Sequence, residues 1–176
     1  MLTNGLVGVR FDKELHLCYQ SHDCGPEGLG TEVVSFVRGL QRDSLRMKIF
    51  KENIRKVEWV DEIDNPTKEQ AEKLIRDPEI LESLKYNEDW HTQFSFDPMA
   101  CFEYVILFGL PIIPEHREYS LEKPTDLIAY AYVMDLNRDV LELYRGGHRM
   151  GEFSFQALVD LVKADWGRMS STWEDY

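Results

Sequence analysis

Two β-rich segments near opposite ends of the chain constrain the fold more than any other feature of this sequence. The first, residues 3–20, has short runs rich in valine, leucine and aromatic residues on either side of the polar loop at residues 12–14. The second, residues 129–146, has two similar runs around a polar turn at residues 137–139. Such pairs of runs are typical of β-hairpins. The sequence therefore predicts one antiparallel hairpin near each end of the chain.

The register of the first hairpin predicts which residues meet at its open end. With a three-residue loop over residues 12–14, counting back along both strands places Thr3 opposite Asp23. The same count places Asn4 opposite His22. We therefore expect these four polar side chains to gather where the hairpin opens.

Between and after the hairpins, apolar residues recur at the spacing of amphipathic helices. One stripe predicts a helix that begins near residues 26–31, and a second predicts a helix over residues 44–60. Two proline-containing start signals predict a small helical insertion over about residues 61–90. Ser154 is the expected N-cap of a later helix that extends toward Trp166.

Hairpins at both ends, with helices between and after them, predict an α+β fold in which helices pack on an antiparallel sheet. The apolar run Phe102–Ile113 suits a buried strand or a buried helix, and its pattern does not decide between them. A length of 176 residues is that of one compact domain, so a single domain over residues 1–176 is expected.

Charge limits the classes of partner. The chain has 32 acidic residues against 20 lysines and arginines, a formal net charge of −12. Such a charge repels a phosphate backbone and disfavours direct nucleic-acid binding. It suits a basic surface of another protein, although solubility alone is the simpler explanation. Without an apolar stretch of about 18 residues or a signal peptide, a soluble cytoplasmic protein that does not enter a membrane is expected.

Cysteine and histidine spacing indicates no metal centre. Cys18, Cys24 and Cys101 are odd in number and lack a C-x-x-C spacing, so reduced thiols are expected. The histidines of the later segments lack the i, i+4 spacing of a helical metal pair. The sequence predicts no metal site and identifies no cofactor.

The stretch YQSHDCGPEGLG, residues 19–30, is the strongest candidate for a site. The chain leaves the hairpin here and enters a helix whose first backbone amides lack partners within the helix. Gly25, Gly28 and Gly30 would let an anionic group approach that backbone closely. The spacing matches neither a Walker nor a dinucleotide motif. The simpler interpretation is that Asp23 caps the helix and the glycines permit a tight turn and close packing.

Four residues of this region are candidate catalytic groups. Cys24 near a helix start could have a lowered pKa, with His22 as a base, but the adjacent Asp23 disfavours a thiolate. Thr3 could act as an N-terminal nucleophile only after cleavage of the chain before it. Leu2 is too large for ordinary removal of the initiator methionine, which argues against this role for Thr3. For Cys24, the adjacent Asp23 favours the role of a small turn residue.

Arg145 and Arg149, which flank the sequence GGH after the second hairpin, are a further candidate anion site. They could bind an anion if this end adjoins the open end of the first hairpin. They are equally compatible with ordinary surface positions.

The segments LTNGLVGVRF, Y---D--P-GLG and AYVMDLNRDVLELYRG together resemble a family of uncharacterised proteins from bacteria, phages and fungi. Openings in that family resemble G-T-R-G followed by Y-N-H-F-D-S-Y-P-x-G-L-G. The positions that match this opening are Thr3, Gly5, Tyr19, Asp23, Pro26, Gly28, Leu29 and Gly30. The chain departs at His22, where the pattern has an aromatic residue, and at Cys24, where it has serine. The resemblance implies the location of a site and no established activity.

These patterns predict a small-ligand pocket at the open end of the first hairpin, with an anion as one option for the ligand. The expected ligand contacts are Thr3, Asn4, Tyr19, Asp23, Gly28 and Gly30. The sequence does not decide whether this pocket also carries out a hydrolytic reaction, and it indicates no substrate. The alternative is a non-enzymatic acidic protein, of a kind that phages encode, which binds a basic surface of a host protein.

Overall fold

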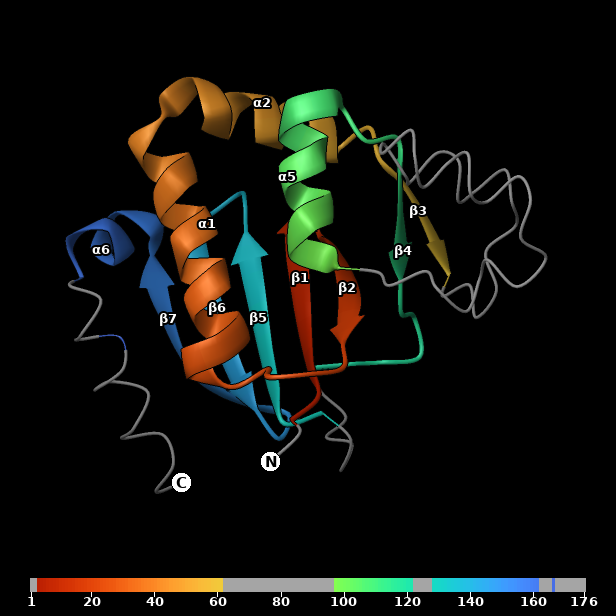
Figure 1. The fold of residues 1–176 in the computed structure, drawn as a ribbon, viewed down its shortest axis with the longest axis vertical. Coiled ribbons are helices and arrows are strands. Elements are labelled where there is room, and N and C mark those ends of the chain that lie inside the picture. The colour runs from red at the N-terminus through yellow and green to blue at the C-terminus, as the bar shows by residue number, and fades with distance from the viewer. Residues whose placement is uncertain (1–2, 62–96, 122–127, 162–165, 167–176) are drawn as a thin grey trace.

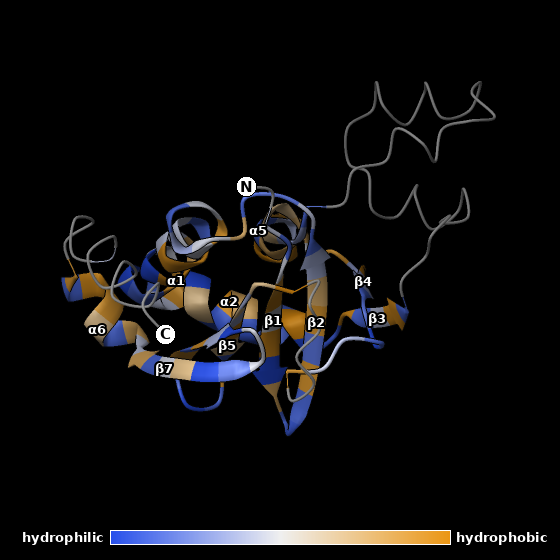
Figure 2. Cartoon of the chain, turned by 90° about the horizontal axis from the view of Figure 1, so that it is seen from below, coloured by the Kyte–Doolittle hydropathy of each residue, from blue (hydrophilic) through white to orange (hydrophobic). Residues whose placement is uncertain are grey.

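The structure is a computed structural model that describes residues 3–61, 97–121, 128–161 and 166. Its fold is α+β, as predicted, with a mostly antiparallel five-stranded sheet and a separate two-stranded sheet (Figure 1). Helices α1 and α5 lie over one face of the larger sheet, and Figure 2, in which the molecule is seen from below, shows both helices on the same side of the strands. In the described part of the chain, no helix is long and apolar enough to cross a bilayer.

The larger sheet contains β1 (Gly5–Phe11), β2 (Glu14–Gln20), β5 (Tyr130–Asp135), β6 (Val140–Arg145) and β7 (His148–Ser154), in the order β2-β1-β5-β6-β7. The smaller sheet pairs β3 (Glu58–Asp61) in parallel with β4 (Ile112–Glu115). The helical segments are the short irregular turn η1 (Pro26–Gly30), α1 (Thr31–Arg42), α2 (Ser44–Ile54), α5 (Pro98–Phe108) and α6 (Phe155–Asp160).

A parallel pairing of β1 with β5 joins the two hairpins into one sheet. Gly5 lies opposite Tyr130 at one end of this pairing, and Arg10 lies opposite Asp135 at the other. Both hairpins were predicted, but their parallel contact was not. It sets which side chains of the first hairpin lie beside those of the second.

The turn of the first hairpin has two residues rather than three. Phe11 pairs with Glu14, and Asp12 and Lys13 between them have φ values of 50° and 72°. Positive φ at both central residues is the geometry of a type I′ turn, whose twist matches that of the flanking strands. The predicted register is therefore wrong by one residue, and Val7, for example, faces Cys18.

The second hairpin and the start of the following helix agree with the sequence patterns. The helix itself is shorter than predicted, because α6 ends at Asp160 and Leu161 after it is extended rather than continuing toward Trp166. β5 and β6 pair from Tyr130 opposite Arg145 to Asp135 opposite Val140, around a turn that includes the predicted residues. Ser154 is the N-cap of α6, and its hydroxyl accepts a hydrogen bond of 3.1 Å from the Ala157 amide. Strand β7, which lies between them, was not predicted.

Two other helix predictions need correction or completion. The helix predicted over residues 44–60 ends at Ile54, and β3 follows it. The run Phe102–Ile113 is divided: its first part belongs to α5, and its last two residues begin β4. Gly109, with a φ of 60°, ends α5 between them in the left-handed conformation typical of helix C-termini. The predicted insertion over residues 61–90 lies, apart from Asp61, outside the described residues.

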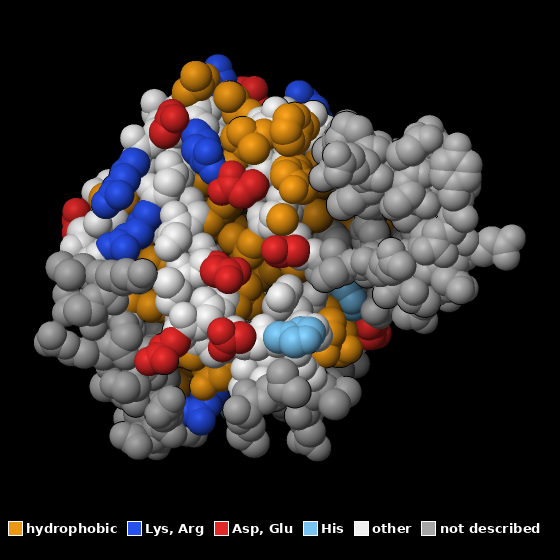
Figure 3. Space-filling view, viewed as in Figure 1, with side chains coloured by type: hydrophobic (Ala, Val, Ile, Leu, Met, Phe, Trp, Pro, Cys, Tyr) orange, Lys and Arg blue, Asp and Glu red, His pale blue; other side chains and the backbone are white. Residues whose placement is uncertain are grey.

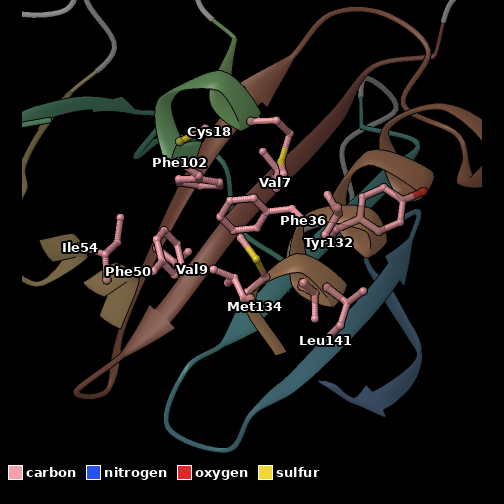
Figure 4. Packing of buried hydrophobic residues seen from close by; sticks show 14 of the residues in the cluster. Val7, Val9, Cys18, Phe36, Phe50, Ile54, Phe102, Tyr132, Met134 and Leu141 are labelled. Carbon is pink, nitrogen blue, oxygen red and sulfur yellow. The ribbon is translucent and has the colours of Figure 1, made fainter. Parts of the chain in front are cut away.

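The main core lies between the helices and one face of the large sheet (Figure 4). Phe36 of α1, Phe50 of α2 and Phe102 of α5 meet there, with ring centroids 5.2 to 6.1 Å apart. A smaller cluster covers part of the opposite face and contains Leu6, Leu17, Leu121, Ala131 and Val133. Because successive strand residues point to opposite faces, the residues between the core positions line this second face.

Replacing Lys13 with glycine tests the turn geometry. Glycine adopts positive φ without the steric penalty of a side chain, so Lys13→Gly should raise the free energy of unfolding by about 1 kcal/mol. Urea denaturation measures this change. Glu14→Gly, one residue later in β2, should lower stability instead. Destabilisation by Lys13→Gly would contradict the two-residue turn.

Candidate functional site

The open end of the first hairpin is held together by backbone hydrogen bonds. The Cys24 amide donates to the carbonyl of Thr3 (3.3 Å) and to its Oγ1 (3.1 Å). Thr3 therefore bonds to Cys24 rather than lying opposite Asp23, which corrects the predicted pairing. The carbonyl of Asn4 accepts from the Ala129 amide at 2.9 Å, and His22 contacts its neighbour Ser21 through Nδ1.

The amides expected to receive an anion already have partners within the chain. The Leu29 amide donates to the Asp23 carbonyl at 2.9 Å. Those of Gly28 and Gly30 both donate to the Gly25 carbonyl, at 3.2 and 3.1 Å. In this arrangement the three amides are not available to a ligand.

Two glycines of this stretch are needed for close packing. A Cβ on Gly28 would lie 2.0 Å from the Asp23 carbonyl oxygen, and one on Gly30 would lie 2.9 Å from the Tyr132 hydroxyl. That hydroxyl donates to the Cys24 carbonyl at 3.2 Å, so it fixes the loop to β5. Gly25 differs, because a Cβ there would meet nothing within 4 Å.

The Cys24 thiol is not arranged as a nucleophile. It is fully buried, and burial, followed by the charge of Asp23, raises its pKa to about 11. The thiol donates to the backbone carbonyls of Gln20 (3.1 Å) and His22 (3.3 Å). It is therefore protonated at neutral pH, in agreement with the favoured structural role. The assignment of Thr3, Asn4 and Asp23 as ligand contacts stays a prediction.

Two matched substitutions test whether the glycines serve packing. Gly28→Ala should lower the free energy of unfolding by more than about 1 kcal/mol, because its Cβ overlaps backbone atoms. Gly25→Ala should change stability little, since Gly25 has an ordinary φ of −66° and open space around it. Thermal and urea denaturation compare the two variants. Equal stability of both would contradict the packing role of Gly28.

A hollow of about 510 Å³ lies on the face of the large sheet opposite α1 and α5. It is lined by Arg10, Leu15, Leu17, Glu115, His116, Arg117, Tyr119, Ser120, Leu121, Tyr144, Gly147 and Arg149. The segment of residues 116–121 forms one wall, and the His116 amide fixes it to β2 by donating to the Leu17 carbonyl at 2.8 Å. Strands β1, β2, β6 and β7 supply other parts of the lining.

Tyr19, one of the predicted ligand residues, contacts two residues that line this hollow. Its ring centroid is 5.6 Å from that of His116 and 5.7 Å from that of Tyr119, and both of these residues line the hollow. Arg149 lines the hollow as well. Arg145, the other candidate arginine, lies with its guanidinium 6.0 Å from the Tyr130 ring centroid.

Glu142 of β6 is a buried carboxylate on this face that accepts hydrogen bonds from several side chains. Its side chain is only 2% exposed. Both of its oxygens accept from Arg10 Nη1, at 2.9 and 2.8 Å, and one accepts from the Tyr144 hydroxyl at 2.9 Å. Arg138 and Arg149 also donate to it, at 3.3 and 3.2 Å. A buried carboxylate is stable only with such charged hydrogen bonds.

Two of the arginines around Glu142, Arg10 and Arg138, have raised pKa values. Burial acts to lower the pKa of Arg10, but hydrogen bonding to Tyr144 and the charge of Glu142 outweigh it, so the pKa is raised. Hydrogen bonding to Arg138 is the largest factor that lowers the pKa of Glu152, which contacts both Arg138 and Arg149. The face therefore carries a network of fixed ion pairs.

Among the charged side chains that line the hollow in the described part of the chain, cations outnumber anions. Arg10, Arg117 and Arg149 face one described carboxylate, Glu115, to which Arg117 Nε donates at 2.7 Å. Glu142 contributes its charge without lining the hollow. The bonds of Arg149 to Glu142 and Glu152 use only Nη2, which leaves its Nε and Nη1 donors outside these pairs.

Arg10, Glu142 and Tyr144 were missed as functional candidates by sequence reasoning. A usable signal was the alternation within β6, where Glu142 and Tyr144 stand two residues apart on either side of Leu143 and so share a face. The role of Arg10 depends on the pairing of β1 with β5, which no local pattern revealed.

Within the described ranges, no group of three or more histidine, cysteine, aspartate or glutamate residues could hold a metal ion. Comparisons of the chain with protein-family models, with curated proteins and with solved structures find no match. The predicted family resemblance stays a prediction, and the chemistry of the hollow is the basis for assigning a function.

Proposed function

We propose that this protein binds a small organic anion, with a carboxylate or phosphate group, in the hollow on the open face of its sheet. The observation that carries the proposal is the placement of charge. Guanidinium groups of Arg10, Arg117 and Arg149 line the hollow, whereas Glu142, which holds two of them, is buried. A ligand would therefore meet cations on a protein whose formal net charge is −12.

The size and apolar lining of the hollow support an organic ligand. Small-molecule sites usually enclose about 300–1,000 Å³ and combine apolar walls with a few placed polar groups. Leu15, Leu17 and Leu121 supply apolar surface, and Tyr119 and Tyr144 supply aromatic rings. Arginine forks match carboxylate and phosphate oxygens in pairs. The expected ligand thus has an apolar or aromatic body and one anionic group.

Binding, rather than hydrolysis, is the proposed activity. The thiol considered as a nucleophile, Cys24, belongs to the core cluster on the helix-covered side of the sheet. The hollow lies on the other side. Tyr144 is held as a neutral hydrogen-bond donor, because burial and its bond to Glu142 raise its pKa.

Two arginines that share the same carboxylates provide a matched test of the proposal. Arg149 and Arg138 both bond to Glu142 and Glu152, but only Arg149 lines the hollow. Isothermal titration with phosphate, pyrophosphate, citrate, hydroxybenzoate and adenosine monophosphate should identify a bound anion. Arg149→Gln should weaken its affinity by about tenfold or more, equivalent to about 1.4 kcal/mol.

Arg138→Gln is the control for indirect effects on the ion-pair network. It should leave the affinity within about threefold of that of the unmodified protein. Thermal unfolding of both variants verifies that the fold is retained. The proposal fails if none of these anions binds, or if the two substitutions weaken binding equally.

A further inference from the structure

A second hollow, of about 400 Å³, lies between α1 and α5 on the helix-covered side of the molecule. Its apolar lining comes from Phe36 of α1 and from Met99 and Ala100 of α5. Glu32, Asp97 and Glu103 also line it. Figure 3 shows this face, with acidic side chains around an apolar recess. We name this feature the α1–α5 groove.

Gly39 lines the α1–α5 groove from within α1, where a glycine is unfavourable. A glycine inside a helix is less stable than alanine by roughly 0.5–1 kcal/mol. Packing does not require it here, because a Cβ on Gly39 would meet nothing within 4 Å. It thus differs from Gly30, whose Cβ would meet Tyr132. What the missing side chain provides is open space in the groove.

The charges of the groove favour a cationic occupant. Among the described residues that line the groove, the cation is Arg46, which forms an ion pair with Glu103. Glu32 is exposed, and Asp97 Oδ1 accepts from the amides of Met99 and Ala100 at the start of α5. The carboxylates of Glu32 and Asp97 therefore give the groove a net negative charge, like that of the whole chain.

Apolar surface on the same face extends beyond the groove, so the occupant is expected to be larger than a single cation. Leu107 and Phe108, at the C-terminal end of α5, are 59% and 57% exposed. Figure 3 shows apolar side chains over this part of the face. Exposed apolar surface next to charged residues is typical of protein interaction sites.

We infer that the α1–α5 groove is a docking site for a peptide segment of another protein, in which an apolar anchor residue is flanked by lysine or arginine. The anchor fills the space that Gly39 leaves open, and its basic neighbours approach Glu32 and Asp97. The groove is separate from the proposed anion site, because the two hollows share no lining residue and lie on opposite sides of the large sheet.

Selection of short random peptides from a displayed library on the purified protein tests the inference. Enriched peptides should combine an apolar residue with flanking lysine or arginine. In fluorescence anisotropy, one such labelled peptide should lose about tenfold or more in affinity for Gly39→Leu, whose side chain fills the groove. Gly39→Ala is the matched control, since it gives a similar gain in helix propensity and keeps most of the space.

A charge reversal keeps the test decisive if Gly39→Leu does not fold. Glu32→Lys should weaken peptide binding, whereas Glu52→Lys, the same change at an exposed residue of α2 outside the groove, should have a smaller effect. The inference is overturned if no basic-apolar peptide is enriched. It is also overturned if the enriched peptides bind the groove variants and their controls equally well.

Discussion

The hydrogen-bonded burial of Glu142 determines the character of the sheet's open face. An isolated carboxylate so deeply buried would be strongly unfavourable, and removing one partner of such a pair typically costs about 3–5 kcal/mol. Its arginine partners come from three places: Arg10 from β1, Arg138 from the turn between β5 and β6, and Arg149 from β7. One buried charge thus fixes three guanidinium groups, two of which line the larger hollow.

This arrangement depends on the parallel contact between the two hairpins. Arg10 reaches Glu142 because β1 pairs with β5, which in turn pairs with β6. The sheet that this contact completes has two chemically different faces. One is apolar and covered by α1, α2 and α5, and the other carries ion pairs and a hollow lined with cations. The two proposed binding surfaces lie on opposite faces for this reason.

Local patterns predicted the parts of the structure that depend on neighbours in sequence. The two hairpins, the start of the helix near Pro26 and the Ser154 cap are examples. The hairpin register was missed because Asp12 and Lys13 adopt positive φ without being glycine or asparagine. The β1–β5 pairing joins segments about 125 residues apart, which periodicity does not report. Arg149 was a candidate from its charge alone, whereas Arg10 and Glu142 acquire their roles only through that pairing.

Glu142→Gln tests most directly whether the guanidinium groups of the hollow bind an anion. In the unmodified protein the negative charge of Glu142 opposes such binding. Glutamine keeps the shape and a hydrogen-bond acceptor but removes the negative charge. We therefore expect lower stability together with tighter anion binding, by roughly tenfold, since an opposing charge several ångströms away contributes on the order of 1–2 kcal/mol. Titration calorimetry on the folded variant measures this affinity. Unchanged or weaker anion binding by the folded variant would contradict the proposed site.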